Sequence, residues 1–199
     1  KASCLRAPVN SNVRRRCDYM SHTTPSIRGG AVELRYPEYA DLECVFATFG
    51  DPEVMKFVNG ALHVDRDASQ SFLTAARASW IVGLDLHWTI ERIADRYPIG
   101  MFRWHLKKAD LEIGYALRRE VWGHGYAKDA AMAVFSYYLR DVRLSRIWAH
   151  VPVQNPRSIS VLKATGLHVV TVDTCTRSSV EGSHHNQEGT LLEHRNGNA

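Results

Sequence analysis

The feature that most constrains the fold is a run of three short segments in which apolar and polar residues alternate: 86–92, 99–105 and 111–117. Alternation with a period of two is typical of β-strands. Only a few residues separate each segment from the next, which leaves no room for the crossover that parallel neighbours need. The sequence therefore predicts antiparallel hairpins in the middle of the chain.

Before this run, the sequence predicts one strand and then helices. Residues 31–36 alternate and predict the strand. Pro37 and the acidic residues after it are typical of a helix start, and we expect this helix to reach Phe49. A short helical turn is expected at 53–57, and a second helix at 67–82, where apolar residues recur on one face.

After the run, helices alternate with single strands. We expect a long helix after Gly125, a strand at 146–151, and a helix from Asn155 that ends at Gly166. The last two strands are expected at 167–172 and 190–193, with a polar loop at 176–188 between them. The order β-α-α-β-β-β-α-β-α-β-β indicates a mixed α/β fold with an antiparallel centre, and neither a Rossmann alternation nor an all-β fold.

Length and composition fit a globular domain. The chain has 199 residues, 45% hydrophobic and 23% charged, so we expect a sizeable core. No apolar run approaches the roughly 20 residues that span a bilayer, and the N-terminus lacks the apolar stretch of a signal peptide. The cysteines are widely spaced, at Cys4, Cys17, Cys44 and Cys175. We expect reduced thiols in a cytoplasmic protein; a bridge between the first two, closing only the N-terminal tail, stays open as an alternative.

Positive charge is concentrated at the N-terminus. Residues 1–30 carry six basic residues against Asp18 alone, a net charge of +5, whereas the whole chain carries +4. The remaining residues therefore sum to −1, which does not favour a nucleic-acid surface on the folded domain. We expect 1–30 to be a basic, disordered leader and 31–195 to be a single domain. RNA binding through Arg14–Arg16 stays open as an alternative.

A glycine-rich turn, Trp122-Gly-His-Gly-Tyr-Ala127, joins the third alternating segment to the long helix. Unpaired N–H groups and the helix dipole attract anions, and Gly123 and Gly125 let a phosphate approach the backbone. The turn matches neither a dinucleotide fingerprint nor a P-loop. Because a glycine pair often only shapes a tight turn, its context must decide. Four residues add positive charge nearby: Arg118, Arg119, His124 and Lys128.

Three motifs together resemble the GNAT acetyltransferase superfamily, and within it the RimJ/RimL-type branch. They are Glu112-Ile-Gly-Tyr-Ala-Leu117, the turn and helix start from Trp122 to Ala130, and Asn155-Pro-Arg-Ser158 followed by Val161 to Leu167. The resemblance covers roughly residues 31–170. It implies the GNAT fold, an α/β fold with a central, mostly antiparallel sheet of six to seven strands. Two parallel strands of this sheet splay apart, and helices flank it.

The resemblance also implies acetyl-CoA as co-substrate, bound between the splayed strands 113–117 and 146–151. Pantetheine then pairs with the first strand, and the backbone of the glycine turn holds the pyrophosphate. By the same resemblance, Asn155 hydrogen-bonds the pantetheine arm, whereas Ser158 caps the next helix and lies near the thioester sulfur. The residues assigned to the cofactor are Ala116, Leu117, Arg118, Trp122, Gly123, His124, Gly125, Tyr126, Ala127, Lys128, Asn155 and Ser158.

The catalytic residues that the resemblance implies are Glu112 and Ser158. A neutral amine attacks the thioester directly, and a base takes a proton from that amine. Glu112 matches the strand glutamate that several family members use, and Glu91 is the second choice. That Glu112 is only a surface residue of a hairpin stays open as an alternative. No metal is expected, because the histidine pair at 184–185 has no third ligand nearby.

The expected function is transfer of the acetyl group of acetyl-CoA to a primary amine, either of a protein N-terminus or of a small molecule. The alternative is a non-catalytic acyl-CoA-binding module with a partner-binding role, because the chain after residue 168 follows no clear family pattern. The expected partners are acetyl-CoA and the amine, with no membrane and no nucleic acid. A homodimer is an option that the sequence leaves open.

Overall fold

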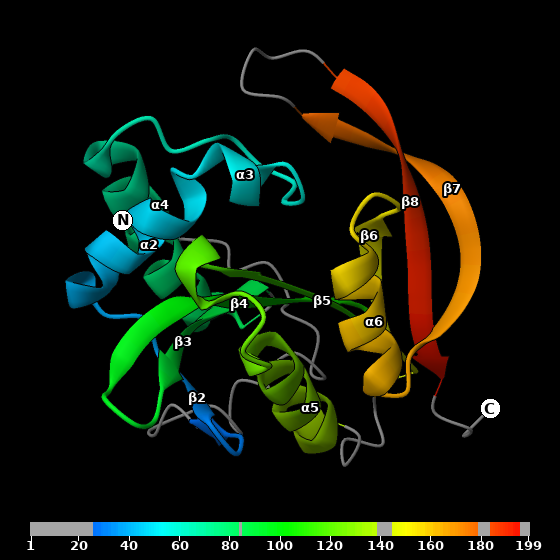
Figure 1. The fold of residues 1–199 in the computed structure, drawn as a ribbon, viewed down its shortest axis with the longest axis horizontal. Coiled ribbons are helices and arrows are strands. Elements are labelled where there is room, and N and C mark those ends of the chain that lie inside the picture. The colour runs from blue at the N-terminus through cyan, green and yellow to red at the C-terminus, as the bar shows by residue number, and fades with distance from the viewer. Residues whose placement is uncertain (1–25, 84, 139–144, 179–183, 196–199) are drawn as a thin grey trace, which may run out of the picture.

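The computed structural model describes residues 26–83, 85–138, 145–178 and 184–195. They form one eight-stranded sheet in the order β1-β2-β3-β4-β5-β6-β8-β7 (Figure 1). The strands are β1 (Ile27–Arg28), β2 (Val32–Arg35), β3 (Asp85–Arg92), β4 (Tyr97–Lys107), β5 (Asp110–Leu117), β6 (Arg146–Pro152), β7 (His168–Ser178) and β8 (His184–Arg195). The mixed α/β fold is confirmed, and the short strand β1 raises the sheet above the expected six to seven strands.

Five α-helices and two short 3-10 helices lie in the described parts of the chain. They are η1 (Tyr39–Asp41), α2 (Leu42–Phe49), α3 (Pro52–Met55), α4 (Arg66–Val82), η2 (Arg119–Val121), α5 (Tyr126–Tyr138) and α6 (Pro156–Ala164). None of these helices is both long and apolar enough to cross a membrane. Their positions agree with the periodicity of the sequence, and Gly166, with φ of +96°, ends α6 as predicted.

The predicted hairpins of β3, β4 and β5 are confirmed. β3 pairs antiparallel with β4, and β4 with β5, the latter from Gly100 opposite Leu117 to Lys107 opposite Asp110. The β4–β5 edge is tightest at Gly100, where an added Cβ would lie 2.3 Å from the carbonyl oxygen of Ala116. Only glycine fits this close approach of two backbones.

Apolar side chains cover both faces of the sheet. On one face, α5 and α6 pack over a large cluster that includes the fully buried Trp88 and Phe102. On the other face, α2, α3 and α4 pack over a smaller cluster that includes Met101 and Ala116. Figure 1 shows these two groups of helices on opposite sides of β4 and β5. Alternation along β5 therefore directs Tyr115 to the α5–α6 face and Ala116 to the α2–α4 face.

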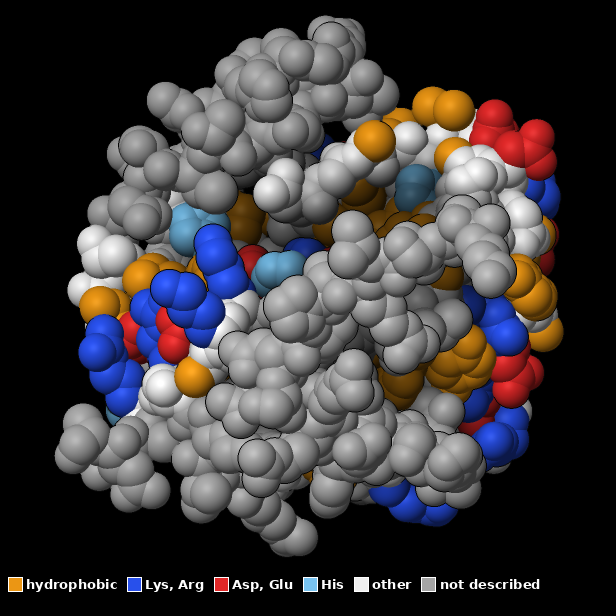
Figure 2. Space-filling view, turned by 180° about the vertical axis from the view of Figure 1, so that it is seen from behind, with side chains coloured by type: hydrophobic (Ala, Val, Ile, Leu, Met, Phe, Trp, Pro, Cys, Tyr) orange, Lys and Arg blue, Asp and Glu red, His pale blue; other side chains and the backbone are white. Residues whose placement is uncertain are grey.

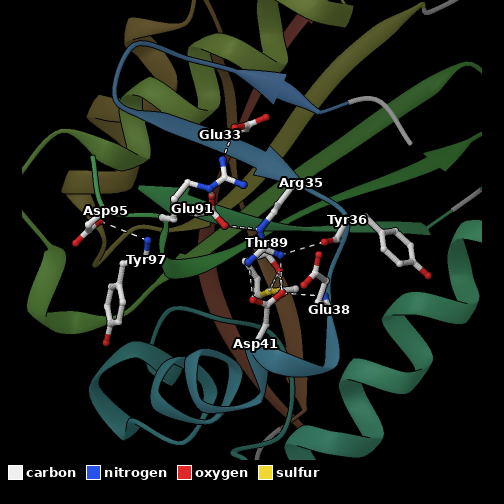
Figure 3. Close-up of polar contacts among 11 residues, drawn as sticks. Glu33, Arg35, Tyr36, Glu38, Asp41, Thr89, Glu91, Asp95 and Tyr97 are labelled. Carbon is white, nitrogen blue, oxygen red and sulfur yellow. Dashed lines mark hydrogen bonds and ion pairs between the residues drawn. The ribbon is translucent and has the colours of Figure 1, made fainter. Parts of the chain in front are cut away.

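A network of paired charges holds β2 against β3 and η1 (Figure 3). Arg35 donates to both carboxylate oxygens of Asp41, at 2.8 and 2.9 Å, and to Glu91 at 2.5 Å. Thr89 donates to Asp41 at 2.7 Å. Burial alone would raise the pKa of Asp41, but the hydrogen bonds, foremost that from Arg35, hold this pKa below its ordinary value. Both carboxylates are buried, so each depends on its partner to offset the cost of desolvation.

The folded part begins before the boundary expected at residue 31. Ile27 is buried, and β1 pairs with β2. The turn after β1 is held by Asp129 of α5, whose carboxylate accepts three consecutive backbone N–H groups, from Gly30 to Val32, at 2.9, 2.7 and 3.0 Å. Residues 26–30 therefore belong to the domain, and the rest of the expected leader, 1–25, lies outside the described residues.

The C-terminal hairpin is longer than predicted. β7 and β8 pair from His168 opposite Glu193 to Ser178 opposite His184, and they form the long curved hairpin in Figure 1. The prediction of a loop over 176–188 was therefore wrong at 176–178 and 184–188, and its middle part, 179–183, lies outside the described residues. The prediction relied on the absence of apolar alternation in this segment. The strands of a hairpin, however, are joined by hydrogen bonds between backbone groups, which form whether or not the side chains alternate.

Candidate active site

The two edges of β5 are used differently. Along the edge toward β4, eight residue pairs face one another, from the first residue of β5 to the last. Along the edge toward β6, parallel pairing covers only Asp110, Leu111 and Glu112, opposite residues 146–148. Beyond Glu112 the two strands part, while β6 goes on to pair with β8 up to Pro152. The splayed parallel pair expected from the resemblance is thus confirmed.

Hydrogen bonds at the two ends of β5 show which residues face each edge. N–H and C=O groups of successive residues in a strand point to alternate edges. Arg118 donates its N–H to the carbonyl of Ile99, beside β4, so the even-numbered residues face β4. The carbonyl of Ala109 accepts the N–H of Ser145, beside β6, so the odd-numbered residues face β6.

Three residues therefore direct their backbone groups into the gap between the strands: Ile113, Tyr115 and Leu117. The indole Nε1 of Trp122 donates to the Leu117 carbonyl at 2.9 Å and covers the far end. Beyond the last paired row, the C=O group of Ile113 and both backbone groups of Tyr115 are left facing the gap. An extended ligand with amide groups, lying parallel to β5, can pair with them as a strand would.

The glycine turn lies just beyond the C-terminal end of β5. Gly123 and Gly125 both have φ of +83°, and nothing lies within 4 Å of a Cβ added to either. Backbone conformation, rather than lack of space, therefore favours glycine here. The first helical hydrogen bond joins the N–H of Asp129 to the carbonyl of Gly125 at 3.0 Å. The N–H groups of the helix's first residues, Tyr126 to Lys128, thus have no partner within α5, which makes an anion site.

Most of the positive side chains expected at this turn are engaged elsewhere. Arg118 pairs with Glu120 at 2.8 Å, and Arg119 pairs with Asp51 at 2.9 Å. The ring of His124 turns back, with Nδ1 3.0 Å from a carbonyl of its own turn. The anion site is therefore built mainly from backbone N–H groups, and the exposed Lys128 adds charge beside them.

The start of α6 differs from the prediction, because Asn155 caps this helix and Ser158 does not. Asn155 Oδ1 accepts the backbone N–H of Ser158 at 3.1 Å. Pro156 takes the first helical position, which places the cap one residue before it. The Ser158 hydroxyl is instead 2.8 Å from the hydroxyl of Tyr115, so α6 contacts β5 across the gap.

Glu112 lies in the last row that β5 shares with β6. It is opposite His105 of β4 and Trp148 of β6, and His105 is in turn opposite Asp85 of β3. Residues directly opposite one another share a face of the sheet, here the α2–α4 face. The Glu112 carboxylate makes no hydrogen bond to another described residue. Figure 2, the view from behind, shows histidine, acidic and basic side chains close together on that side of the molecule.

The neighbours of Glu112 largely neutralise one another. Arg103 binds both oxygens of Asp85, at 2.7 and 3.1 Å. Burial would raise the pKa of Asp85, but the hydrogen bonds from Arg103 hold this pKa below its ordinary value. Burial lowers the pKa of His87 to about 4, so this ring is uncharged at neutral pH. Glu112 is therefore the carboxylate of this group that has no bidentate partner among the described residues.

Glu91, the second choice for the base, lies elsewhere. It is six residues along β3 from Asp85, which puts it about 20 Å from the row of Glu112. It is 3% exposed and pairs with Arg35 at 2.5 Å and Arg96 at 2.7 Å. This placement favours Glu112.

Metal ligation and thiol chemistry find no support in the described part of the chain. No three side chains of His, Cys, Asp or Glu there are grouped so that they could hold a metal ion. Cys44 is a free, buried thiol, and burial raises its pKa to about 12, which disfavours the reactive thiolate.

Comparison with known proteins decides the family. The family model described as acetyltransferase (GNAT) domain matches residues 31–168. The chain belongs to the GNAT acetyltransferases. It is 28% identical to YoaA, an uncharacterized N-acetyltransferase of Bacillus subtilis, over 145 residues, 71% of this chain and 82% of that protein. Like the rest of the family it is an acetyl-CoA-dependent acyltransferase.

Solved structures show the same fold. A Salmonella typhimurium acetyltransferase that modifies the N-terminal serine of ribosomal protein L7/L12 superposes with a TM-score of 0.72 at 12% identity, over 86% of this chain and 99% of that one. The spermidine N-acetyltransferase of Vibrio cholerae, solved with CoA and spermine, gives 0.69 at 15% identity, over 83% and 95%. At such low identity these likenesses establish the fold alone.

Three features of this GNAT site escaped the sequence analysis. They are the Tyr115–Ser158 contact, the Asp85–Arg103 pair beside Glu112, and the grip of Asp129 on the turn after β1. Alternation alone places Arg103 on the same face of its strand as the residue two positions later. The position of Arg103 could therefore have been predicted from the sequence. The other two join residues 43 and about 98 positions apart, which no local pattern reports.

Proposed function

We propose that acetyl-CoA binds in the gap between β5 and β6 and that the chain transfers its acetyl group directly to a primary amine. The observation that carries this proposal is the parting of the two strands after three paired rows, with an anion site at the open end. Pantetheine would take the place of the missing strand and pair with the backbone of Ile113 and Tyr115. The pyrophosphate would then reach the N–H groups that follow Gly123.

The chemistry follows from the two faces of β5. The amine nitrogen attacks the thioester carbon, and Glu112, on the α2–α4 face, takes the proton, directly or through a water. Backbone N–H groups directed into the gap stabilise the negative charge on the carbonyl oxygen. Ser158, on the α5–α6 side, lies near the sulfur that leaves. The roles proposed for the other cofactor-binding residues depend on the same placement of acetyl-CoA.

The acceptor enters, in this proposal, from the α2–α4 face. The charges of Asp85 and Arg103 cancel there and His87 is neutral, so Glu112 gives this face a negative charge that suits a cationic amine. Two acceptor classes fit, namely protein N-termini and small-molecule polyamines. The structural neighbours named above act on one of each class.

The placement of the cofactor is tested by calorimetry of acetyl-CoA binding to Gly125→Glu. The new carboxylate would face the pyrophosphate, so binding should be lost. Gly83→Glu is the matched control, because Gly83 also has a left-handed φ, +73°, with open space around it, but ends α4. Binding that survives Gly125→Glu would refute the site, and loss in both variants would point to backbone strain instead.

The acceptor is tested with a panel that contains spermidine, spermine and a peptide with an N-terminal serine. Release of CoA thiol with one of them identifies the class. Tight binding of acetyl-CoA without turnover across the panel would favour the alternative, a non-catalytic acyl-CoA-binding module. A cytoplasmic location and a homodimer belong to the same proposal, and light scattering in solution tests the second.

A further inference from the structure

The contact between Tyr115 and Ser158 joins the two sides of the gap. Tyr115 belongs to β5, three residues beyond the last row shared with β6. Ser158 is in the first turn of α6, which packs against β6 and β8. Their hydroxyl oxygens are 2.8 Å apart, an ordinary hydrogen bond between two groups that can each donate or accept.

The direction of this hydrogen bond follows from acidity. A phenol is a stronger acid than an aliphatic alcohol and therefore the better donor. Burial raises the pKa of Tyr115 to about 12, so its hydroxyl keeps its proton at neutral pH. Tyr115 thus donates and the Ser158 oxygen accepts. The hydrogen of Ser158 is then free to point to a third group.

The surroundings of Ser158 limit where that hydrogen can point. Its own backbone N–H is held by Asn155 Oδ1 at 3.1 Å, which fixes the first turn of α6. Tyr115 occupies one side of the hydroxyl, and its ring stacks against Phe102 with centroids 6.2 Å apart. A hydroxyl fixed in this way is a preorganised donor, which costs little reorganisation when charge develops beside it.

We propose that Tyr115 is a positioning residue that orients the Ser158 hydroxyl as a hydrogen-bond donor to the sulfur of the leaving CoA. This inference rests on the proposed function, which places the thioester sulfur near Ser158. It adds a residue whose side chain touches neither the amine nor the carbonyl carbon. Because Glu112 and Tyr115 project from opposite faces of β5, the base acts on the side of the amine and the donor on the side of the sulfur.

The step balances without proton transfer from either hydroxyl. The amine nitrogen forms a bond to the carbonyl carbon, the C–S bond breaks, and its electron pair stays on sulfur. Glu112 accepts the amine proton and passes it to solvent, from which the CoA thiolate takes up a proton. A thiol has an ordinary pKa near 8.5, so its thiolate is too weak a base to deprotonate Ser158 or Tyr115. Both hydroxyls therefore act by hydrogen bonding alone.

The test is the titration of CoA bound to the protein, followed by the ultraviolet absorbance of its thiolate. Protein loaded with desulfo-CoA is the reference, so the protein's own thiols and phenols cancel. A donor aimed at sulfur stabilises the thiolate. Tyr115→Phe and Ser158→Ala should each move the midpoint up by roughly half to one pH unit. The double variant should move it no further than Ser158→Ala alone.

Matched variants separate orientation from packing. Tyr138→Phe removes a hydroxyl from another buried tyrosine, one that packs on Trp104 of the same core, and should leave the midpoint unchanged. Ser158→Thr keeps the hydroxyl and should keep the wild-type midpoint. Phenylalanine fills nearly the volume of tyrosine, and a thermal melt of Tyr115→Phe confirms folding. If that variant melts early, the contrast between Ser158→Thr and Ser158→Ala still reports on the donor.

The outcomes are distinct. A midpoint that rises in Ser158→Ala but not in Tyr115→Phe overturns the role of Tyr115. A midpoint unchanged in both overturns the contact with sulfur. Tighter binding of CoA to Tyr115→Phe would also contradict the proposal. It would mean that the hydrogen bond between Tyr115 and Ser158 closes the gap in the free protein and opposes the binding of CoA. If the wild-type protein binds neither CoA nor acetyl-CoA, the proposed function itself fails.

Discussion

β5 joins the two halves of the sheet in two different ways. Toward β4 it is paired along its whole length, and the two backbones are so close that Gly100 has no room for a side chain. Toward β6 it is paired over three residues and then open. The closed edge serves stability, because its hydrogen bonds and packing are complete. The open edge leaves backbone groups without a partner strand, and a ligand of extended shape can pair with them.

The charged residues show the same contrast. On the closed side, Asp41 and Glu91 are buried and held by Arg35. At the open side, the Glu112 carboxylate makes no such bond among the described residues. A buried carboxylate with all its partners is a structural group, whereas an unpaired one beside an opening is available for chemistry. Substitutions on the open side should therefore lower the rate of acetyl transfer, whereas substitutions on the closed side should lower the free energy of unfolding.

The largest expected effect is on the open side. Glu112→Gln removes the base but keeps the shape, and should lower kcat by about 10²- to 10⁴-fold. Steady-state kinetics with the amine identified in the panel checks this, while calorimetry should show unchanged acetyl-CoA affinity. Glu193→Gln, in the same row but two strands away on β8, is the control and should keep kcat. An unaltered rate in Glu112→Gln would exclude it as the base.

The next effect is on the closed side. Asp41→Asn leaves the Arg35 charge without its partner and should lower the free energy of unfolding by about 3–5 kcal/mol at pH 7. The folded-state pKa of Asp41 is lowered, so its contribution is full above the ordinary value near 4 and is lost as pH falls below it. Urea titrations at pH 7 and pH 3 should therefore show a gap between wild type and variant that narrows in acid.

A surface pair provides the control for that measurement. Asp95 is 48% exposed and pairs with Arg92, so Asp95→Asn should leave the unfolding curve unchanged at both pH values. A gap for Asp41→Asn that stays the same at pH 3 would show that its charge is not what stabilises the fold.

A smaller effect comes from two glycines on neighbouring strands. Gly100→Ala places a methyl group against the backbone of β5 and should cost about 1–3 kcal/mol of unfolding free energy. Gly114→Ala meets nothing within 4 Å and should change stability by less than about 0.5 kcal/mol. Denaturation curves of the two variants compare these two positions of the β4–β5 pair directly. Equal losses of unfolding free energy would mean that β4 and β5 are packed no more tightly at Gly100 than at Gly114.

The smallest expected effect is at the cap of α6. Asn155→Ala removes the side chain that accepts the N–H of Ser158, and should cost about 1 kcal/mol of stability. If Asn155 also contacts pantetheine, KM for acetyl-CoA rises in addition. Asn155→Asp keeps the cap and should restore stability, which separates the two roles. No change in KM or kcat in Asn155→Ala would remove it from the cofactor site.

The sequence predicted the elements well wherever one period dominates over enough residues. The alternating segments became β3, β4 and β5, and the helix after Gly125 became α5. β1 was missed because two residues cannot display a period, and the cap of α6 was misplaced because Ser158 and Asn155 are both good cap residues. The ends of β7 and β8 were missed because their pairing depends on backbone rather than on side-chain pattern.

The site was predicted less completely, for a different reason. The glycine turn is local, so its geometry could be anticipated, and the structure gives both glycines the same left-handed φ. The gap itself depends on how β5 lies beside a strand about 30 residues later, and only the family resemblance predicted it. Tyr115 stands in the same motif as Glu112, but its contact with Ser158 exists only after α6 has folded across the gap.

The open edge of β5 is the proposed binding place of acetyl-CoA. A crystal structure of the complex tests this most directly. We expect pantetheine to hydrogen-bond the backbone of Ile113 and Tyr115 and the pyrophosphate to contact the N–H groups between Gly123 and Lys128. A cofactor bound elsewhere, with the two strands brought together or the gap filled by side chains, would contradict the account.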